Sequence, residues 1–122
     1  MPLYATHGFE DVTEHIDILV IPGGSPGRLA MQKHEAFMKF LKNTADTATN
    51  VLTVFHPMVN WIHKARWVQD GKIWTSSGVT AGMDMAHAFM MSMYGEDVAT
   101  VMARYMENVP NTDPNDDPFA TV

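Results

Sequence analysis

The chain of 122 residues contains no cysteine. It therefore forms no disulfide and offers no thiolate to a metal ion or to a substrate. Basic residues are few as well, because eight lysines and arginines stand against fourteen aspartates and glutamates, a net charge of −6. This charge disfavours binding to a nucleic-acid backbone or to an anionic membrane surface.

Long apolar runs are also missing from the sequence. No segment approaches the roughly 20 apolar residues of a transmembrane helix, and the N-terminus lacks the charged-then-apolar pattern of a signal peptide. We therefore expect a cytoplasmic protein without membrane or nucleic-acid partners. The share of hydrophobic residues, 46%, is typical of a folded chain. Residues 1–122 are predicted to form one domain, with residues 1–15 as a leading segment and residues 110–122 as an irregular tail.

Two short apolar runs predict parallel strands. Residues 17–21 show no polar alternation, which suits a strand covered on both faces, and Pro22-Gly23-Gly24 ends this run abruptly. Residues 50–55 form the second run, which His56-Pro57 terminates. Between them, residues 29–43 are predicted to form a helix with an apolar face made of Phe37, Phe40 and Leu41.

A β-hairpin is predicted over residues 66–75. Its turn is placed at Asp70-Gly71, since both central positions of a type I′ turn need positive φ. This register puts Trp67 directly opposite Trp74 on one face of the hairpin. The outgoing strand is expected to end at Ser76-Ser77-Gly78.

Two helices are predicted after the hairpin. The first runs from about Ala81 to Tyr94, with Gly95 just after its end, and its packing side is expected to consist of Ala81, Met85, Ala88, Phe89 and Ser92. The second begins at Glu96-Asp97, where acidic side chains favour the helix dipole. It carries an apolar stripe of Val98, Val101, Met102, Tyr105 and Val109.

Seven of the eleven methionines fall in these two helices. Methionine either fills irregular gaps in a core or serves an adaptable interface. The second alternative predicts a homo-oligomer, because apolar helix surface and an uncovered sheet edge both favour association.

The order of elements is strand, helix, strand, hairpin, helix, helix, which predicts an α/β layered domain with a mostly parallel sheet. In such sheets small-molecule ligands bind beyond the carboxyl ends of the strands. Three segments leave those ends in this chain: Pro22-Gly23-Gly24, Phe55-His56-Pro57 and Ser76-Ser77-Gly78. A ligand site is expected where the three converge.

Two of these segments carry candidate site residues with competing interpretations. Gly23 and Gly24 would present backbone N–H groups to an anion or a carbonyl oxygen, or they only allow a tight turn. His56 would act as an acid or base at a strand end, or it is an ordinary loop histidine.

Hydroxyl groups follow the third strand, at Ser76, Ser77 and Thr80. Serine catalysis needs a base and an orienting group, whereas helix capping needs neither, so capping is the favoured interpretation. Ser77 is retained with the two glycines as a ligand-binding candidate. No metal or cofactor is predicted, because the histidines show no His-Glu-x-x-His pattern and the aspartates around Asp113 lack the glycine and glutamate of an EF-hand.

Several segments resemble the ThiJ/PfpI family, within the class I glutamine-amidotransferase-like superfamily, and most nearly its isocyanide-hydratase-like and regulator-associated branches. These segments are Asp17–Gly24, Lys64–Asp84, Asn111–Pro114 and Asp117–Ala120. The resemblance implies a flavodoxin-like sandwich, often dimeric. It also implies a nucleophilic cysteine on a sharp strand-to-helix turn, an assisting acidic residue from an early strand, and an oxyanion held by N–H groups near the Pro-Gly-Gly turn.

The chain departs from this family pattern where the chemistry is expected. The strands that normally precede Asp17 are mostly absent, and Val54-Phe55-His56-Pro57 stands where the cysteine-containing turn belongs. Val59–Ile62 already resembles the segment just before the hairpin. The pattern therefore predicts a truncated flavodoxin-like fold with an internal junction near residues 54–57.

Three functions are compatible with these observations. The first is a ThiJ/PfpI-like protein without the cysteine nucleophile, which would be a pseudoenzyme, a subunit of an oligomer or a shortened gene product. The second is an isocyanide-hydratase-like hydratase or hydrolase of altered mechanism, which would act on a small molecule at Gly23 and Gly24 with His56 as acid or base. The third is a non-enzymatic module that dimerises through the methionine-rich helices.

Overall fold

The computed structural model describes residues 4–23, 33–53, 62 and 64–120. A short 3₁₀ helix, η1 (Phe9–Asp11), precedes the main elements. These are β1 (Ile18–Ile21), α2 (Glu35–Thr47), β2 (Asn50–Thr53), β3 (Trp67–Asp70), β4 (Ile73–Ser76), α3 (Val79–Tyr94) and α4 (Glu96–Tyr105). Within the described residues, no helix is long and apolar enough to cross a membrane.

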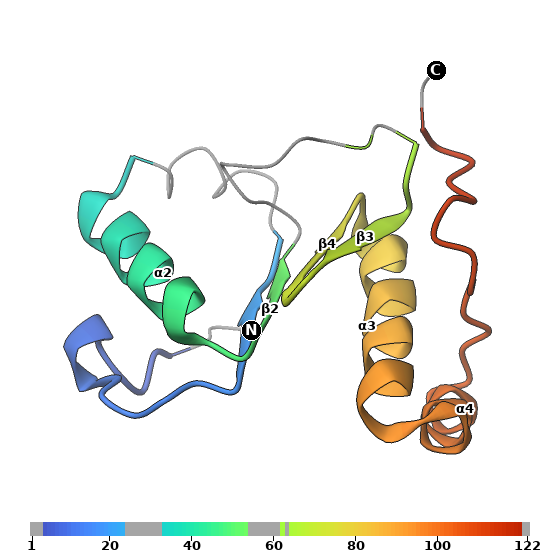
Figure 1. Cartoon of the computed structure of the whole chain (residues 1–122), viewed down its shortest axis with the longest axis horizontal. Coiled ribbons are helices and arrows are strands. Elements are labelled where there is room, and N and C mark those ends of the chain that lie inside the picture. The colour runs from blue at the N-terminus through green and yellow to red at the C-terminus, as the bar shows by residue number, and fades with distance from the viewer. Residues whose placement is uncertain (1–3, 24–32, 54–61, 63, 121–122) are drawn as a thin grey trace.

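The four strands form one mostly parallel sheet in the order β1-β2-β4-β3. β1, β2 and β4 run parallel to one another, and only β3 is antiparallel, as the partner of β4 in the hairpin. Helix α2 lies on one face of the sheet and α3 on the other, with α4 and the C-terminal tail beyond α3 (Figure 1). The protein is thus an α/β layered fold, as predicted, and it is compatible with a truncated flavodoxin-like sandwich.

The core lies between the hairpin and α3. It consists of Leu52, Trp67, Trp74, Met85 and Phe89, with Ala88 packed against them. The rings of Trp74 and Phe89 meet edge to face with their centroids 5.5 Å apart, an arrangement that favours aromatic pairs. The packing side predicted for α3 is therefore confirmed at Ala81, Met85, Ala88 and Phe89, whereas Ser92 is exposed.

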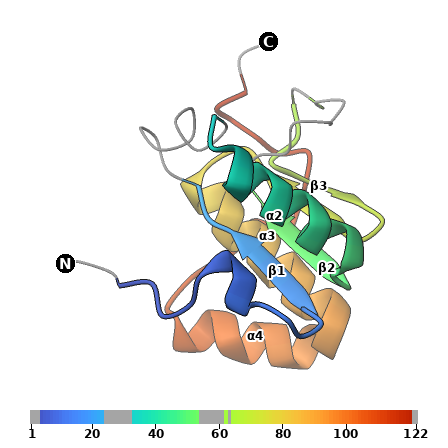
Figure 2. The same ribbon diagram turned by 90° about the vertical axis from the view of Figure 1, so that its left-hand side faces the viewer.

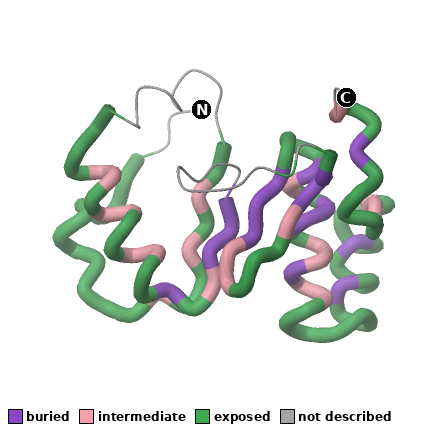
Figure 3. The backbone as a smooth tube through the Cα atoms, turned by 45° about the horizontal axis from the view of Figure 1, so that its top comes forward, coloured by how far each residue is buried: buried purple, intermediate pink, exposed green. Residues whose placement is uncertain are grey.

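Strand β1 is formed as predicted but is not covered on both faces. Its side chains alternate between exposed and half-buried, and Ile18 and Val20 are 39% and 60% exposed. β1 is the edge strand next to β2, whereas α3 packs over the hairpin at the other side of the sheet (Figure 3). The continuous apolar run predicted a buried strand, but the place of β1 in the sheet leaves one face open.

The hairpin exists, but each predicted partner is wrong by two residues, because the two-residue loop lies one position later in the chain than predicted. The loop residues are Gly71 and Lys72, and the paired residues are Gln69 with Trp74 and Trp67 with Ser76. Gly71 has a φ of +55°, which suits the first central position of a two-residue turn. Both tryptophans still point to the same face, as diagonal neighbours, and both are buried.

The ends of the helices follow local hydrogen bonds. Helix α2 begins where the Nδ1 atom of His34 accepts the N–H of Phe37 at 3.2 Å. It ends at Thr47, four residues beyond the predicted end at residue 43; residues 29–32 lie outside the described part. Helices α3 and α4 meet at Gly95, which has a φ of +86° and closes α3 as predicted.

The apolar stripe of α4 faces outward. The alanines of this helix are the buried side chains: Ala99 is 0% and Ala103 6% exposed. Val101 and Tyr105 are 64% and 91% exposed. The stripe predicted for this helix therefore does not contribute to the core. The small alanines allow α4 to pack closely on α3, and the larger side chains remain on the surface.

Candidate functional site

The carboxyl ends of three strands meet at one edge of the sheet, as predicted. Parallel pairing sets Ile21 beside Thr53, and Thr53 beside Thr75. Gly23 follows β1 and is exposed. Gly24 and His56 lie outside the described residues, so the roles expected of them stay predictions.

Ser77 lies at this edge, directly after β4. Its side chain is exposed, and its backbone N–H donates to the carbonyl oxygen of Arg66 at 3.0 Å. That N–H group therefore extends the hairpin ladder and is not free to hold an oxyanion. The exposed hydroxyl remains the group that Ser77 can offer to a ligand, and this role also stays a prediction.

The hydroxyls near the start of α3 do not cap the helix, contrary to expectation. The N-cap residue is Gly78, and no side chain caps the helix there. The Oγ1 atom of Thr80 instead accepts a hydrogen bond from the Nη2 atom of Arg66 at 3.2 Å. The Oγ atom of Ser76 is buried and has no hydrogen-bond partner among the described residues. Such an unpaired hydroxyl is costly to bury.

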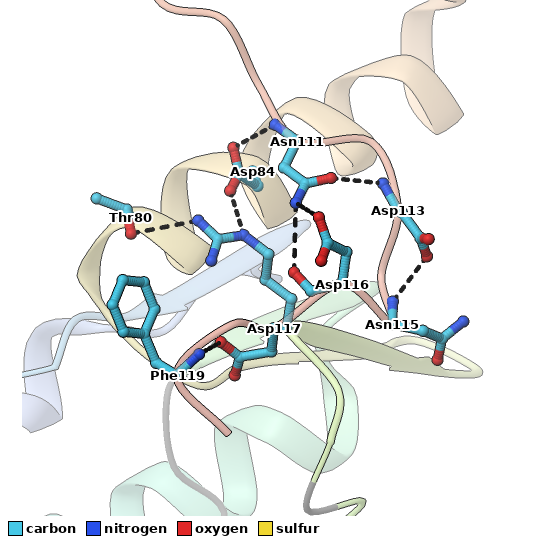
Figure 4. Close-up of polar contacts among 9 residues, drawn as sticks. Thr80, Asp84, Asn111, Asp113, Asn115, Asp116, Asp117 and Phe119 are labelled. Carbon is cyan, nitrogen blue, oxygen red and sulfur yellow. Dashed lines mark hydrogen bonds and ion pairs between the residues drawn. The ribbon is translucent and has the colours of Figure 1, made fainter. Parts of the chain in front are cut away.

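A buried ion pair, missed by the sequence interpretation, organises this edge. The Nε atom of Arg66 lies 2.6 Å from the Oδ2 atom of Asp84, and the two side chains are 9% and 7% exposed. The Oδ1 atom of Asp84 accepts the backbone N–H of Asn111 at 2.9 Å (Figure 4). Both carboxylate oxygens of Asp84 are thus hydrogen-bonded, which offsets part of the cost of burying the charge.

The same pair attaches the C-terminal tail to the domain. The backbone N–H of Arg66 donates to the carbonyl oxygen of Pro114 at 2.7 Å. Within the tail, the side chain of Asn111 donates to Asp116 and accepts the N–H of Asp113. These contacts hold the irregular tail across the start of α3 (Figure 4).

One signal in the sequence would have pointed to this pair. Asp84 lies three residues after Ala81 and one before Met85, on the side of α3 that packs on the sheet. A charged side chain on an apolar helix face requires a buried partner. Arg66, at the start of the predicted hairpin, is the cation that pairs with Asp84.

The Arg66–Asp84 ion pair has a structural role in this arrangement. The guanidinium group of Arg66 and the carboxylate of Asp84 bond to each other, to Thr80 and to the tail. Neither group is presented to solvent as an acid, base or nucleophile. Across the described part of the chain, no group of three or more histidine, aspartate or glutamate side chains is placed to hold a metal ion.

A separate cleft of about 380 Å³ lies on the α3 side of the sheet, between the hairpin, α3 and the tail. It is lined by Trp67, Gln69, Trp74, Ala88, Met91, Ser92 and Pro114. The lining is mostly aromatic and apolar and contains no charged side chain. The hydroxyl of Ser92 donates to the carbonyl oxygen of Phe89 at 2.7 Å. Neither Gly23 nor Ser77 borders this cleft.

No protein-family model matches the chain. The sequence is 25% identical over 137 residues to an isonitrile hydratase from Pseudomonas putida. This similarity covers 90% of the chain but only 59% of the relative, so the chain spans about three fifths of the protein it matches. Isonitrile and isocyanide name the same chemical group, so this similarity agrees with the resemblance to the isocyanide-hydratase-like branch of the ThiJ/PfpI family.

Proposed function

We propose that this chain is a ThiJ/PfpI-like domain without the cysteine chemistry of that family, and that it does not catalyse hydration. One observation carries the proposal: the chain has no cysteine, yet it is similar to an isonitrile hydratase over 90% of its length. The resemblance implies a cysteine nucleophile. When a nucleophile is removed, the remaining backbone donors lower only part of the barrier.

The described edge of the sheet supports this proposal. A substitute nucleophile would need a base within hydrogen-bonding reach. In residues 64–120, the hydroxyls of Ser76 and Ser77 bond to no histidine or carboxylate, and the carboxylate of Asp84 is engaged by Arg66 and Asn111. None of these described groups is therefore paired with a base in the way that a substitute nucleophile requires.

The alignment with the relative supports the proposed internal junction. It spans 137 residues, more than the 122 residues of the chain. It must therefore include positions at which the relative has a residue and this chain has none. A shortened connection near Val54-Phe55-His56-Pro57 is one place for such positions, and it is where the family resemblance implies the cysteine-bearing turn.

An isonitrile hydration assay tests the proposal. Hydration of an alkyl isonitrile gives an N-substituted formamide, which proton NMR detects directly. We expect the purified chain to form this product no faster than buffer, with an isonitrile hydratase as positive control. Turnover well above buffer would contradict the proposal. A His56→Ala variant then decides the mechanism, because loss of that turnover would assign it to the histidine.

A further inference from the structure

The side of α4 that faces away from α3 carries an exposed apolar stripe. Val98, Val101, Met102 and Tyr105 are 42%, 64%, 40% and 91% exposed, and they follow one another at helical spacing. The buried Ala99 and Ala103 hold the helix against α3, so the orientation of the stripe is set. Figure 2 shows α4 running along one edge of the molecule. Contiguous apolar surface of this kind marks an interaction site.

Two of the three charged residues of α4, Asp97 and Arg104, lie on one flank of this stripe, whereas Glu96 falls on the side of the alanines. Asp97 and Arg104 are seven residues apart, which is close to two helical turns, so both project from the same flank. Arg104 is the single basic residue of the helix. Within the described chain neither side chain forms an ion pair. The opposite flank of the stripe carries the alanines that pack on α3.

We propose that α4 binds α4 of a second copy of this chain, antiparallel and about a two-fold axis. The stripe is its own complement in this arrangement, because Val98 lies opposite Tyr105 and Val101 opposite Met102. In an antiparallel pair, like flanks face each other. Asp97 of each copy therefore meets Arg104 of the other, twice per dimer, as a two-fold axis requires.

A parallel pair does not satisfy the same groups. It would bring the Asp97 and Arg104 flank of one helix against the alanine flank of the other, which α3 already occupies. The dipoles of two antiparallel helices also attract, whereas those of a parallel pair repel. Charge and packing thus favour the same orientation.

The interface is expected to be small. Ten residues of helix span about 15 Å, although Tyr94, Met106 and Val109, which are 58%, 54% and 94% exposed, extend the apolar surface. Interfaces of this size are weak, so we expect a dissociation constant on the order of 10 µM. This inference does not depend on the proposed function.

The absence of cysteine makes a disulfide test clean, because each introduced thiol is the single one in the chain. A tagged Val98→Cys chain is mixed with an untagged Tyr105→Cys chain at about 50 µM, above the dissociation constant expected for a small interface, and is mildly oxidised. We expect a tagged–untagged dimer as the main product on a non-reducing gel. Asn43→Cys, on the exposed side of α2 and on the other face of the sheet, is the matched control and should not cross-link.

Cross-linking of each variant mainly with itself would overturn the antiparallel arrangement. A monomer in sedimentation experiments at about 100 µM, roughly ten times the dissociation constant expected here, would overturn the proposal altogether and assign the stripe to a segment of another protein.

Charge reversal supplies an independent test. Arg104→Asp should weaken the dimer by about tenfold or more, because each of the two contacts between the copies then brings two carboxylates together. The combined variant Asp97→Arg, Arg104→Asp should return the dissociation constant to within about threefold of the original. Sedimentation equilibrium measures both. A combined variant as weak as Arg104→Asp would overturn the charge pairing and with it the antiparallel alignment.

Discussion

Helices α2 and α3 lie on opposite faces of the same sheet, but they are buried to very different extents. α3 buries Ala81, Asp84, Met85 and Phe89, whereas α2 buries none of its thirteen residues. Segregation of apolar and polar side chains is nevertheless stronger in α2 than in α3. A marked apolar stripe therefore predicts that a helix has an inner side, and it does not predict how deeply that side is buried.

The difference follows from what each helix packs against. α3 covers the hairpin, where Trp67 and Trp74 supply a large apolar surface, and the Arg66–Asp84 pair and the tail fasten its start. α2 is joined instead to the leading segment, where Phe9 stacks on Phe40 with ring centroids 4.9 Å apart. We therefore expect the free energy of folding to be concentrated on the α3 side.

The largest expected effect comes from breaking the buried ion pair. Arg66→Ala should reduce the free energy of unfolding by about 3–5 kcal/mol, because Asp84 would remain buried without its counter-charge. Urea unfolding followed by tryptophan fluorescence measures the loss. Asp70→Asn, an exposed acid at the end of β3, is the control and should change stability by less than about 0.5 kcal/mol.

A double replacement tests whether the loss of stability in Arg66→Ala arises from the buried Asp84 carboxylate that is left without a partner. Arg66→Met combined with Asp84→Leu removes both charges and should cost less than Arg66→Ala alone. If Arg66→Ala lowers the free energy of unfolding by less than about 1 kcal/mol, this pair does not anchor the α3 side. The pair would then not explain why α3 is held more firmly than α2.

Truncating one phenylalanine on each helix tests the comparison directly. Phe89 on α3 is 4% exposed, so Phe89→Ala should cost about 3–4 kcal/mol. Phe40 on α2 is only half-buried, and Phe40→Ala should cost about half as much. The same urea titration applies to both variants. Equal losses would show that α2 contributes as much to the core as α3.

The junction between α3 and α4 is expected to show a smaller effect. Gly95→Ala should cost about 1–2 kcal/mol, because a φ of +86° is unfavourable for a residue with a Cβ atom. No atom lies within 4 Å of the added carbon, so the loss comes from the backbone alone. Thermal unfolding measures it. Gly78→Ala, at an extended position with open space, should cost less, and a reversed order would contradict the backbone explanation.

The smallest effect is expected at the unpaired hydroxyl on the α3 side. Ser76→Ala should leave stability unchanged or raise it by up to about 1 kcal/mol, since it removes a buried group without a hydrogen bond. Differential scanning calorimetry resolves such a change. Ser77→Ala, at the exposed neighbour, is the control. A clear loss in Ser76→Ala alone would show that this hydroxyl has a partner in solution.

Most elements of the fold were predictable, and their burial was less so. Residues 17–21, the hairpin and both C-terminal helices were predicted from apolar runs, an Asp-Gly pair and Gly95. The hairpin register was not predictable from the turn, because contacts with β2 decide it: the N–H of Val51 donates to the carbonyl oxygen of Lys72 at 2.8 Å. The Nζ atom of Lys72 also donates to the carbonyl oxygens of Asp46 and Ala48. Such long-range bonds override a local turn preference.

Some features of the candidate site were likewise predictable from the sequence, and others were not. The convergence of three strand ends followed from the expected parallel sheet, and the register of β1, β2 and β4 confirms it. The engagement of the Ser77 N–H by Arg66 did not follow, nor did the bond from the tail to Asp84. Each of these two hydrogen bonds joins groups that are distant in sequence or that have several possible partners, so the sequence alone does not predict it.

The sequence by itself determined the order of strands and helices, the absence of any thiol and the presence of an apolar stripe on α4. Those properties depend on residue identity and on spacing within one element. Only the tertiary structure decided that β1 lies at an edge, that Arg66 pairs with Asp84, and that α4 turns its alanines inward and its stripe outward. The physical reason is that burial depends on which surfaces meet across the chain, and a periodic pattern specifies a face without specifying what covers it.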